Sequence, residues 1–158
     1  MGLTLVVAVA AAVAVTLFVA WAYHTAQRLN RLHIRLDRSR DALQAALDRR
    51  CAVVATLYPE LAPLARMTED VRLQPTDLHT RLQQEARLTE QVEQLTAGKA
   101  APAQWEDAST RVALAQRFYN DAVTDTLALR ERPSVRALRL GGTAALPAYA
   151  VDRHLPAG

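Results

Sequence analysis

The sequence predicts an all-α protein, in which an N-terminal transmembrane helix continues into an antiparallel long-helix bundle of three to four helices with a flexible C-terminal tail. Three observations carry this prediction. Residues 3–23 form an uncharged apolar run, the later apolar residues recur at helical spacing, and nothing after residue 24 alternates Thr, Val and Ile as a strand does. Aromatic residues make up only 5% of the chain, which favours close helix packing through Leu, Ala and Val.

Residues 3–23 read LTLVVAVAAAVAVTLFVAWAY. A helix of this length spans roughly 31 Å, about the thickness of the hydrocarbon core of a bilayer. Trp21 and Tyr23 stand at its C-terminal end, where aromatic side chains contact lipid headgroups. Residues 20–22 also have the A-x-A form of a signal cleavage site, but no basic residue precedes the run and the run is longer than a usual signal core. We therefore expect an uncleaved anchor at 3–23.

The charges that flank this run predict its orientation. Residues 24–50 hold seven Arg against three Asp, whereas Met1 and Gly2 carry no charged side chain. The positive-inside rule then predicts a single-pass protein of the cell (inner) membrane with its C-terminal domain in the cytoplasm. We expect Arg28 and Arg31 to contact headgroups, since the basic parts of the chain, 24–50 and 133–158, suit an anionic lipid surface better than nucleic acid.

Residues 24–58 contain neither Gly nor Pro and are expected to continue the membrane helix as a stalk roughly 50 Å long. An apolar stripe on this helix comprises Leu29, Leu32, Leu36, Leu43, Ala46, Val53 and Leu57, with Ser39 and Arg50 at two further stripe positions. The opposite face carries Arg31, Arg35, Arg38 and Asp41 and is predicted to be solvated. Pro59 and Pro63 are expected to break the helix, because proline lacks an amide donor and crowds the preceding turn.

Two helices are predicted in the middle of the chain, a short one at 64–73 and a longer one at 77–97. Thr76 is the expected N-cap of the longer helix, and Gly98 its expected C-terminal stop. Its inner face is predicted to contain Leu78, Leu82, Leu88, Val92 and Leu95, and its solvent face Glu85, Glu90 and Glu93.

A last long helix is predicted at 104–131, after Pro102 in its first turn. Its stripe repeats at alternating steps of four and three through Ala108, Val112, Ala115, Tyr119, Ala122, Thr126 and Leu129. Pro133 should stop it. A turn capped by Ser134 should cover 135–140 and end at the Gly141-Gly142 pair, and residues 143–158 should be extended or disordered. The expected domains are therefore 3–23, 24–132 and 133–158.

No catalytic, cofactor-binding or metal-binding set emerges from the sequence. None of His24, His33, His79 and His154 follows a Glu by three residues, as a di-iron bundle requires. Cys51 is the single cysteine, expected as a small buried or interfacial residue. We therefore expect no enzyme activity and no cofactor.

Tyr119 and Asn120 are the polar pair for which the sequence suggests a specific contact. Tyr119 can be an ordinary core tyrosine with its hydroxyl bonded to a neighbour. The sharper hypothesis is that Tyr119 or Asn120 bonds Asp37 or Arg50 on the first helix and so fixes the register of the bundle.

Two segments resemble the LemA family of bacterial membrane proteins. Residues 35–50 open with RLD and close with LDRR, similar to the family's R-V-D-N-A-W…L-K-R-R stretch. Residues 111–123 read RVALAQRFYNDAV, similar to its R-I-A-x-A-R-x-x-Y-N-x-A-V pattern. Pro133 and the LPAY of 146–149 resemble the family's tail, whereas 60–105 matches poorly. The matching positions singled out are Asp37, Arg49, Arg50, Arg111, Tyr119 and Asn120.

The resemblance implies a short extracytoplasmic N-terminus, one membrane helix and a long-helix bundle with no established enzymatic activity. Our first functional hypothesis is a scaffold or adaptor for a membrane-associated protein complex. The alternative is an oligomeric coiled-coil subunit of cell-envelope or division machinery, and a third reading is an enzyme or lipid-handling protein with a site between helices. The expected partners are the lipid bilayer and other membrane or membrane-associated proteins, with homo-oligomers left open and no nucleic acid or small-molecule substrate.

Overall fold

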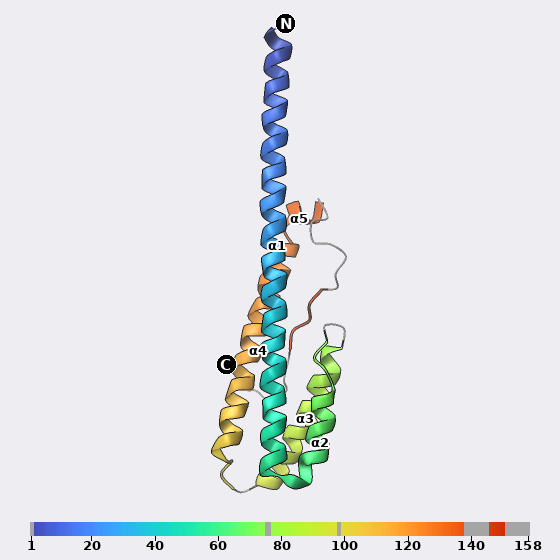
Figure 1. The fold of residues 1–158 in the computed structure, drawn as a ribbon, viewed down its shortest axis with the longest axis vertical. Coiled ribbons are helices and arrows are strands. Elements are labelled where there is room, and N and C mark those ends of the chain that lie inside the picture. The colour runs from blue at the N-terminus through green and yellow to red at the C-terminus, as the bar shows by residue number, and fades with distance from the viewer. Residues whose placement is uncertain (1, 75–76, 98, 138–145, 151–158) are drawn as a thin grey trace.

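The computed structural model describes residues 2–74, 77–97, 99–137 and 146–150, and over these residues it consists of helices joined by short non-helical segments (Figure 1). The elements are α1 (Gly2–Leu57), the 3-10 turn η1 (Pro59–Leu61), α2 (Ala62–Asp70), α3 (Leu78–Thr96), α4 (Ala103–Arg130) and α5 (Pro133–Ala137). The predicted all-α class is confirmed for this part of the chain, and the predicted helix limits agree with the observed ones to within a few residues.

The dominant element is α1, a single unbroken helix of 56 residues. It ends at Leu57 because Tyr58 leaves the helical conformation and Pro59 opens η1. Its N-terminal half contains the uncharged apolar run 3–23, which we call the apolar half of α1, and the side chains of this run are exposed except for the half-buried Ala22. In the described part of the chain, α1 is therefore the one helix that is long and apolar enough to cross a membrane. Its apolar half packs against no other described element.

The second half of α1 is covered by α4, which runs antiparallel to it (Figure 1). Arg35 pairs with Asp125 near one end of this contact, and Arg50 lies over the ring of Trp105 near the other. The predicted stripe of the last long helix is confirmed, since its members are buried apart from the half-buried Ala115. Alanines at these positions allow the two helix backbones to approach closely.

The other side of α1 is covered by α2 and α3, which lie beside its C-terminal end (Figure 1). The described members of the predicted α1 stripe are all buried or half-buried, so that stripe is also confirmed. One core cluster comprises Leu43, Leu47, Leu73, Leu78, Val112, Tyr119, Val123 and Ala150, and a second comprises Cys51, Val54, Leu61, Ala65, Leu88 and Val92. Both clusters use α1 as one wall.

Two predictions for α3 are wrong. Glu85, expected in solvent, is 1% exposed, because its carboxylate is paired with arginines inside the protein. Leu95, expected inside, is exposed because it lies in the last turn of α3 at the edge of the core. Thr76 and Gly98, predicted to bound this helix, lie outside the described residues.

The C-terminal part packs against the rest in two places. Val135 of α5 is buried with Leu129, and Leu32 of α1 packs against both. Residues 146–150 are non-helical, as predicted, but Ala150 is buried in the first core cluster, so these five residues are docked and not disordered. The predicted helix end at Gly141-Gly142 lies outside the described residues.

Candidate functional site

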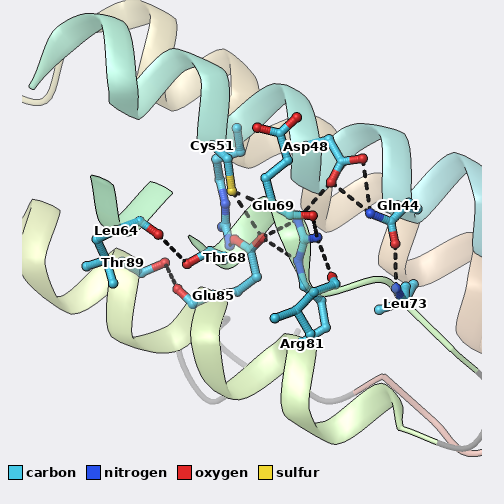
Figure 2. A network of polar contacts seen from close by, with 12 residues as sticks. Gln44, Asp48, Cys51, Leu64, Thr68, Glu69, Leu73, Arg81, Glu85 and Thr89 are labelled. Atoms are coloured by element: carbon cyan, nitrogen blue, oxygen red, sulfur yellow. Dashed lines mark hydrogen bonds and ion pairs between the residues drawn. The ribbon is translucent and has the colours of Figure 1, made fainter. Parts of the chain in front are cut away.

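The most polar part of the interior lies where α1, α3 and the segment between α2 and α3 meet. We call the five residues Asp48, Arg50, Cys51, Arg81 and Glu85 the buried charge cluster. Gly and Pro are absent from residues 60–97 except at positions 63 and 75, so α3 forms readily and presents Arg81 and Glu85 one turn apart on its inner face. Figure 2 shows the side chains of α1 and α3 pointing toward each other across this contact.

Arg81 is fully buried, and its guanidinium uses every donor that it has. Nε and Nη2 donate to Glu85 Oε1 at 3.0 and 2.8 Å, and Nη2 also donates to Asp48 Oδ1 at 2.9 Å. Nη1 donates to the carbonyl oxygens of Val71 at 2.7 Å and Glu69 at 3.2 Å (Figure 2). Burial alone would lower the pKa of Arg81, but the charge and hydrogen bonds of Glu85 raise it above its ordinary value.

Glu85 connects this guanidinium to a second one. Its Oε2 accepts a hydrogen bond from Arg50 Nη2 at 2.8 Å, and both side chains are almost fully buried. The guanidinium carbon of Arg50 lies 5.6 Å from the ring centroid of Trp105, within range of a cation–π contact. A single carboxylate of α3 is therefore joined directly to α1 and, through Arg50, to the start of α4.

Cys51 lies beside the same carboxylate. Its Sγ is 3.5 Å from Glu85 Oε1 and 3.9 Å from Arg81 Nη2. Burial, and then the negative charge of Glu85, raise the pKa of the Cys51 thiol above its ordinary value of 9.0. The thiol is therefore neutral at physiological pH, and the prediction of a buried cysteine is confirmed.

A short polar chain ties the loop after α2 to α1. Gln44 Nε2 donates to both carboxylate oxygens of Asp48, at 2.8 and 3.0 Å, and Gln44 Oε1 accepts a hydrogen bond from the backbone amide of Leu73 (Figure 2). Because Arg81 also binds the carbonyl oxygens of Glu69, at the end of α2, and of Val71, three backbone groups in and beside this loop are satisfied by side chains of α1 and α3.

Tyr119 and Asn120 do not make the contact that we predicted for them. The Tyr119 hydroxyl donates to the carbonyl oxygen of Ala148 at 3.0 Å, and Asn120 pairs with both backbone groups of Ala150, each at 2.9 Å. Gln116 Nε2 donates to the same Ala150 carbonyl at 2.9 Å. The hypothesis of a bond to Asp37 or Arg50 is wrong, because these α4 side chains face the returning C-terminal segment and hold its backbone.

The remaining positions of the LemA-like motifs, apart from Arg50, lie outside the buried charge cluster. Asp37 is exposed and pairs with Arg40 at 3.2 Å, Arg49 is exposed, and Arg111 is exposed and pairs with Asp107 at 2.9 Å. Of the six motif positions, only Arg50 belongs to the buried charge cluster.

The four predicted headgroup residues follow one another along one helix. Trp21, Tyr23, Arg28 and Arg31 are all exposed side chains of α1 at the end of its apolar half. Gln27 binds two of them, donating to the Tyr23 hydroxyl at 2.6 Å and accepting from Arg31 at 3.5 Å. Contact with a bilayer by these residues stays a prediction.

Sequence reasoning missed Arg81 and Glu85, although a usable signal was present. Both fall on the stripe that runs from Leu78 through Leu88 to Val92 at steps of three and four. We assigned Glu85 to solvent because it is charged, whereas a charged pair one turn apart on an apolar face indicates a buried ion pair.

The buried charge cluster is suited to holding helices together. Its arginines and carboxylates form ion pairs with one another, although Arg50 Nε is buried without a hydrogen-bond partner. Its thiol is neutral, and among the described residues no group of three or more His, Cys, Asp or Glu side chains is arranged to hold a metal ion. Comparison with known proteins identifies no relative, because no family model, curated protein or solved structure matches the chain. The resemblance to the LemA family stays an expectation from the residues.

Proposed function

We propose that this chain is a single-pass protein of the cell membrane whose C-terminal helices form a cytoplasmic bundle that acts as a scaffold or adaptor and catalyses no reaction itself. The proposed partners are the bilayer and other membrane or membrane-associated proteins. The LemA-like motifs of the sequence agree with such a role.

One observation carries the proposal. The helix α1 runs without a break from an apolar half that no other described part of the chain covers into a half that forms one wall of both main core clusters. Exposed apolar surface of this extent is unfavourable in water and favourable in a bilayer. An anchor that is continuous with the core also holds the folded part close to the membrane.

The packing of the α1 stripe favours this role over an oligomeric coiled coil. The described stripe residues are covered by α2, α3 and α4 of the same chain, whereas a coiled-coil subunit would leave them for a second copy. The neutral Cys51 thiol and the mutually paired charges around it also leave no activated nucleophile in that cluster.

Photo-crosslinking in living cells tests the scaffold role. A photoreactive amino acid replaces Phe118 of α4 or Met67 of α2, both of which are exposed apolar side chains, and the full chain is expressed at its normal level. A scaffold should give a discrete adduct with a different protein from at least one of these positions, and Leu114→Asp, one turn from Phe118, should weaken the Phe118 adduct. Adducts between two copies of the chain alone would support the coiled-coil alternative, and the lack of any protein adduct would contradict both.

A further inference from the structure

The C-terminal end of α4 returns to the part of α1 that directly follows the apolar run. Leu129 and Val135 are buried together, and Leu32 of α1 packs against them. This small apolar contact fixes the turn between α4 and α5 against the juxtamembrane stretch of α1 (Figure 1). Residues about one hundred positions apart in the sequence therefore meet at one level of the molecule.

The register of this contact brings positive charges together. Arg35 pairs with Asp125 at 2.7 Å, and one turn closer to the N-terminus of α1, Leu32 packs against Leu129. Because the helices are antiparallel, one further turn of α1 brings Arg28 level with the start of the α4–α5 turn at Arg132.

Few acidic side chains balance this end of the molecule. Residues 24–36 contain three Arg and no acidic residue, and residues 126–137 contain three Arg and one Glu. Arg35 is already paired with Asp125, and Arg130 has contacts of its own. Four exposed arginines remain, Arg28 and Arg31 on α1 with Arg132 and Arg136 on the other segment, and we call them the basic collar.

The collar lies at the depth of lipid headgroups if residues 3–23 span the bilayer. At ~1.5 Å per residue along α1, Arg28 follows Tyr23 by roughly 8 Å and Arg31 by roughly 12 Å. A headgroup layer is about 5–8 Å thick, and the potential of an anionic surface extends about one Debye length of ~8 Å beyond it. Arginine side chains are long enough to cover the remaining distance, and their guanidinium groups bind phosphate in a bidentate manner.

We propose that the basic collar is a binding site for anionic phospholipid headgroups, in which the α4–α5 turn supplies half of the charge through Arg132 and Arg136. This inference rests on the proposed membrane insertion and goes beyond it, because it assigns a lipid preference and a role for residues far from the anchor. Anionic lipid would neutralise four arginines held together by the Leu32, Leu129 and Val135 contact, and would hold the turn at the membrane surface.

Quenching of tryptophan fluorescence by brominated lipids tests the proposal on the full chain in lipid nanodiscs. Trp21 lies within reach of the lipid, whereas Trp105 lies at the far end of α4 beside Arg50 and supplies a constant background. Brominated phosphatidylglycerol or brominated phosphatidylcholine is added at the same low mole fraction, and the ratio of quenching gives the relative association constant of the anionic lipid.

The double variant Arg132→Gln/Arg136→Gln is compared with Arg66→Gln/Arg87→Gln, which removes two exposed arginines from α2 and α3, away from the collar. We expect the collar variant to lower the preference for phosphatidylglycerol roughly 25-fold, since each of the two arginines at an anionic surface changes the association constant about fivefold. The control should keep the wild-type preference, and thermal unfolding of both variants should resemble that of the wild type.

Three results would overturn the proposal. These are a wild-type chain without preference for the anionic lipid, a collar variant that keeps the preference, and a control variant that loses it equally. A chain whose Trp21 is quenched by neither lipid would contradict the membrane anchor as well, which separates failure of the proposed function from failure of the collar alone.

Discussion

Arg81 and Glu85 form an ion pair of 2.8 Å within α3, and neither side chain is exposed to solvent beyond 1%. The pair is not isolated, because Glu85 also binds Arg50 of α1 and Arg81 also binds Asp48. A complete buried network of this kind contributes modestly to the stability of the fold. Removing one member lowers the stability strongly, since the other members are then left charged and unpaired.

Replacing Glu85 by Gln should destabilise the protein strongly. The substitution keeps the shape of the side chain but leaves Arg50 and Arg81 without their shared counter-charge, at a cost of about 3–5 kcal/mol in the free energy of unfolding. Urea unfolding of the full chain in detergent, followed by tryptophan fluorescence, measures the change. Glu90→Gln, at an exposed position on the same helix, is the matched control and should stay within about 0.5 kcal/mol of the wild type.

The ion pair between Arg35 and Asp125 should contribute little, despite its short distance of 2.7 Å. Both side chains are about half exposed, so water screens the attraction and the side chains lose freedom when they pair. Asp125→Asn is expected to change the free energy of unfolding by about 0.5 kcal/mol or less in the same assay. A loss as large as that of Glu85→Gln would show that burial does not decide the strength of these pairs.

The stability of the protein should fall at alkaline pH through Cys51. The raised pKa of the thiol means that the folded state keeps its proton at pH values where the unfolded state, with a pKa near 9.0, has lost it. Stability is therefore retained below pH 9.0 and lost as the pH rises above it, by about 1.4 kcal/mol one unit higher.

Urea unfolding between about pH 8 and pH 10 checks this linkage. Cys51→Ala should lower stability at every pH but flatten the decline, because the titrating group is gone. If the free energy of unfolding falls equally steeply with pH in the wild type and the variant, the decline belongs to other groups. One such group is Tyr119, because burial also raises the pKa of its hydroxyl.

Asn120 should control the docking of residues 146–150. Asn120→Ala removes the two hydrogen bonds to Ala150 and leaves a buried backbone amide without its partner, a loss of about 1–3 kcal/mol locally. Hydrogen exchange at the Ala150 amide should accelerate markedly, while exchange in α3 stays unchanged. Tyr119→Phe, which removes one hydrogen bond to Ala148, should have a smaller effect in the same direction, and Asp121→Asn, at an exposed position, should have none.

The helices could be predicted from the sequence because their limits are local properties. The lack of Gly and Pro between Gly2 and Pro59 predicts the length of α1, and the steps of three and four between Ala108 and Leu129 predict which face of α4 is buried. Arg50 was recognised as a stripe position, and it is buried.

The contacts of the polar residues could not be predicted in the same way. The stripe and the neighbouring Arg81 indicate that Glu85 is buried, but its second counter-charge comes from Arg50, thirty-five residues earlier, and no local pattern contains that partner. Asn120 binds Ala150 because the chain turns back after α4, and nothing in the α4 sequence specifies what its polar side chains meet. Sequence periodicity predicts which face of a helix is buried, whereas contacts between distant parts of the chain decide which partners a polar side chain on that face binds.

The most direct test of the membrane-anchored account is extraction of membranes that contain the full chain with alkaline carbonate, which removes peripheral proteins. The exposed apolar half of α1 predicts that the intact chain stays in the membrane pellet and that a detergent is needed to release it. Recovery of the intact chain in the carbonate supernatant would contradict the anchor, and with it the scaffold role and the lipid site that depend on it.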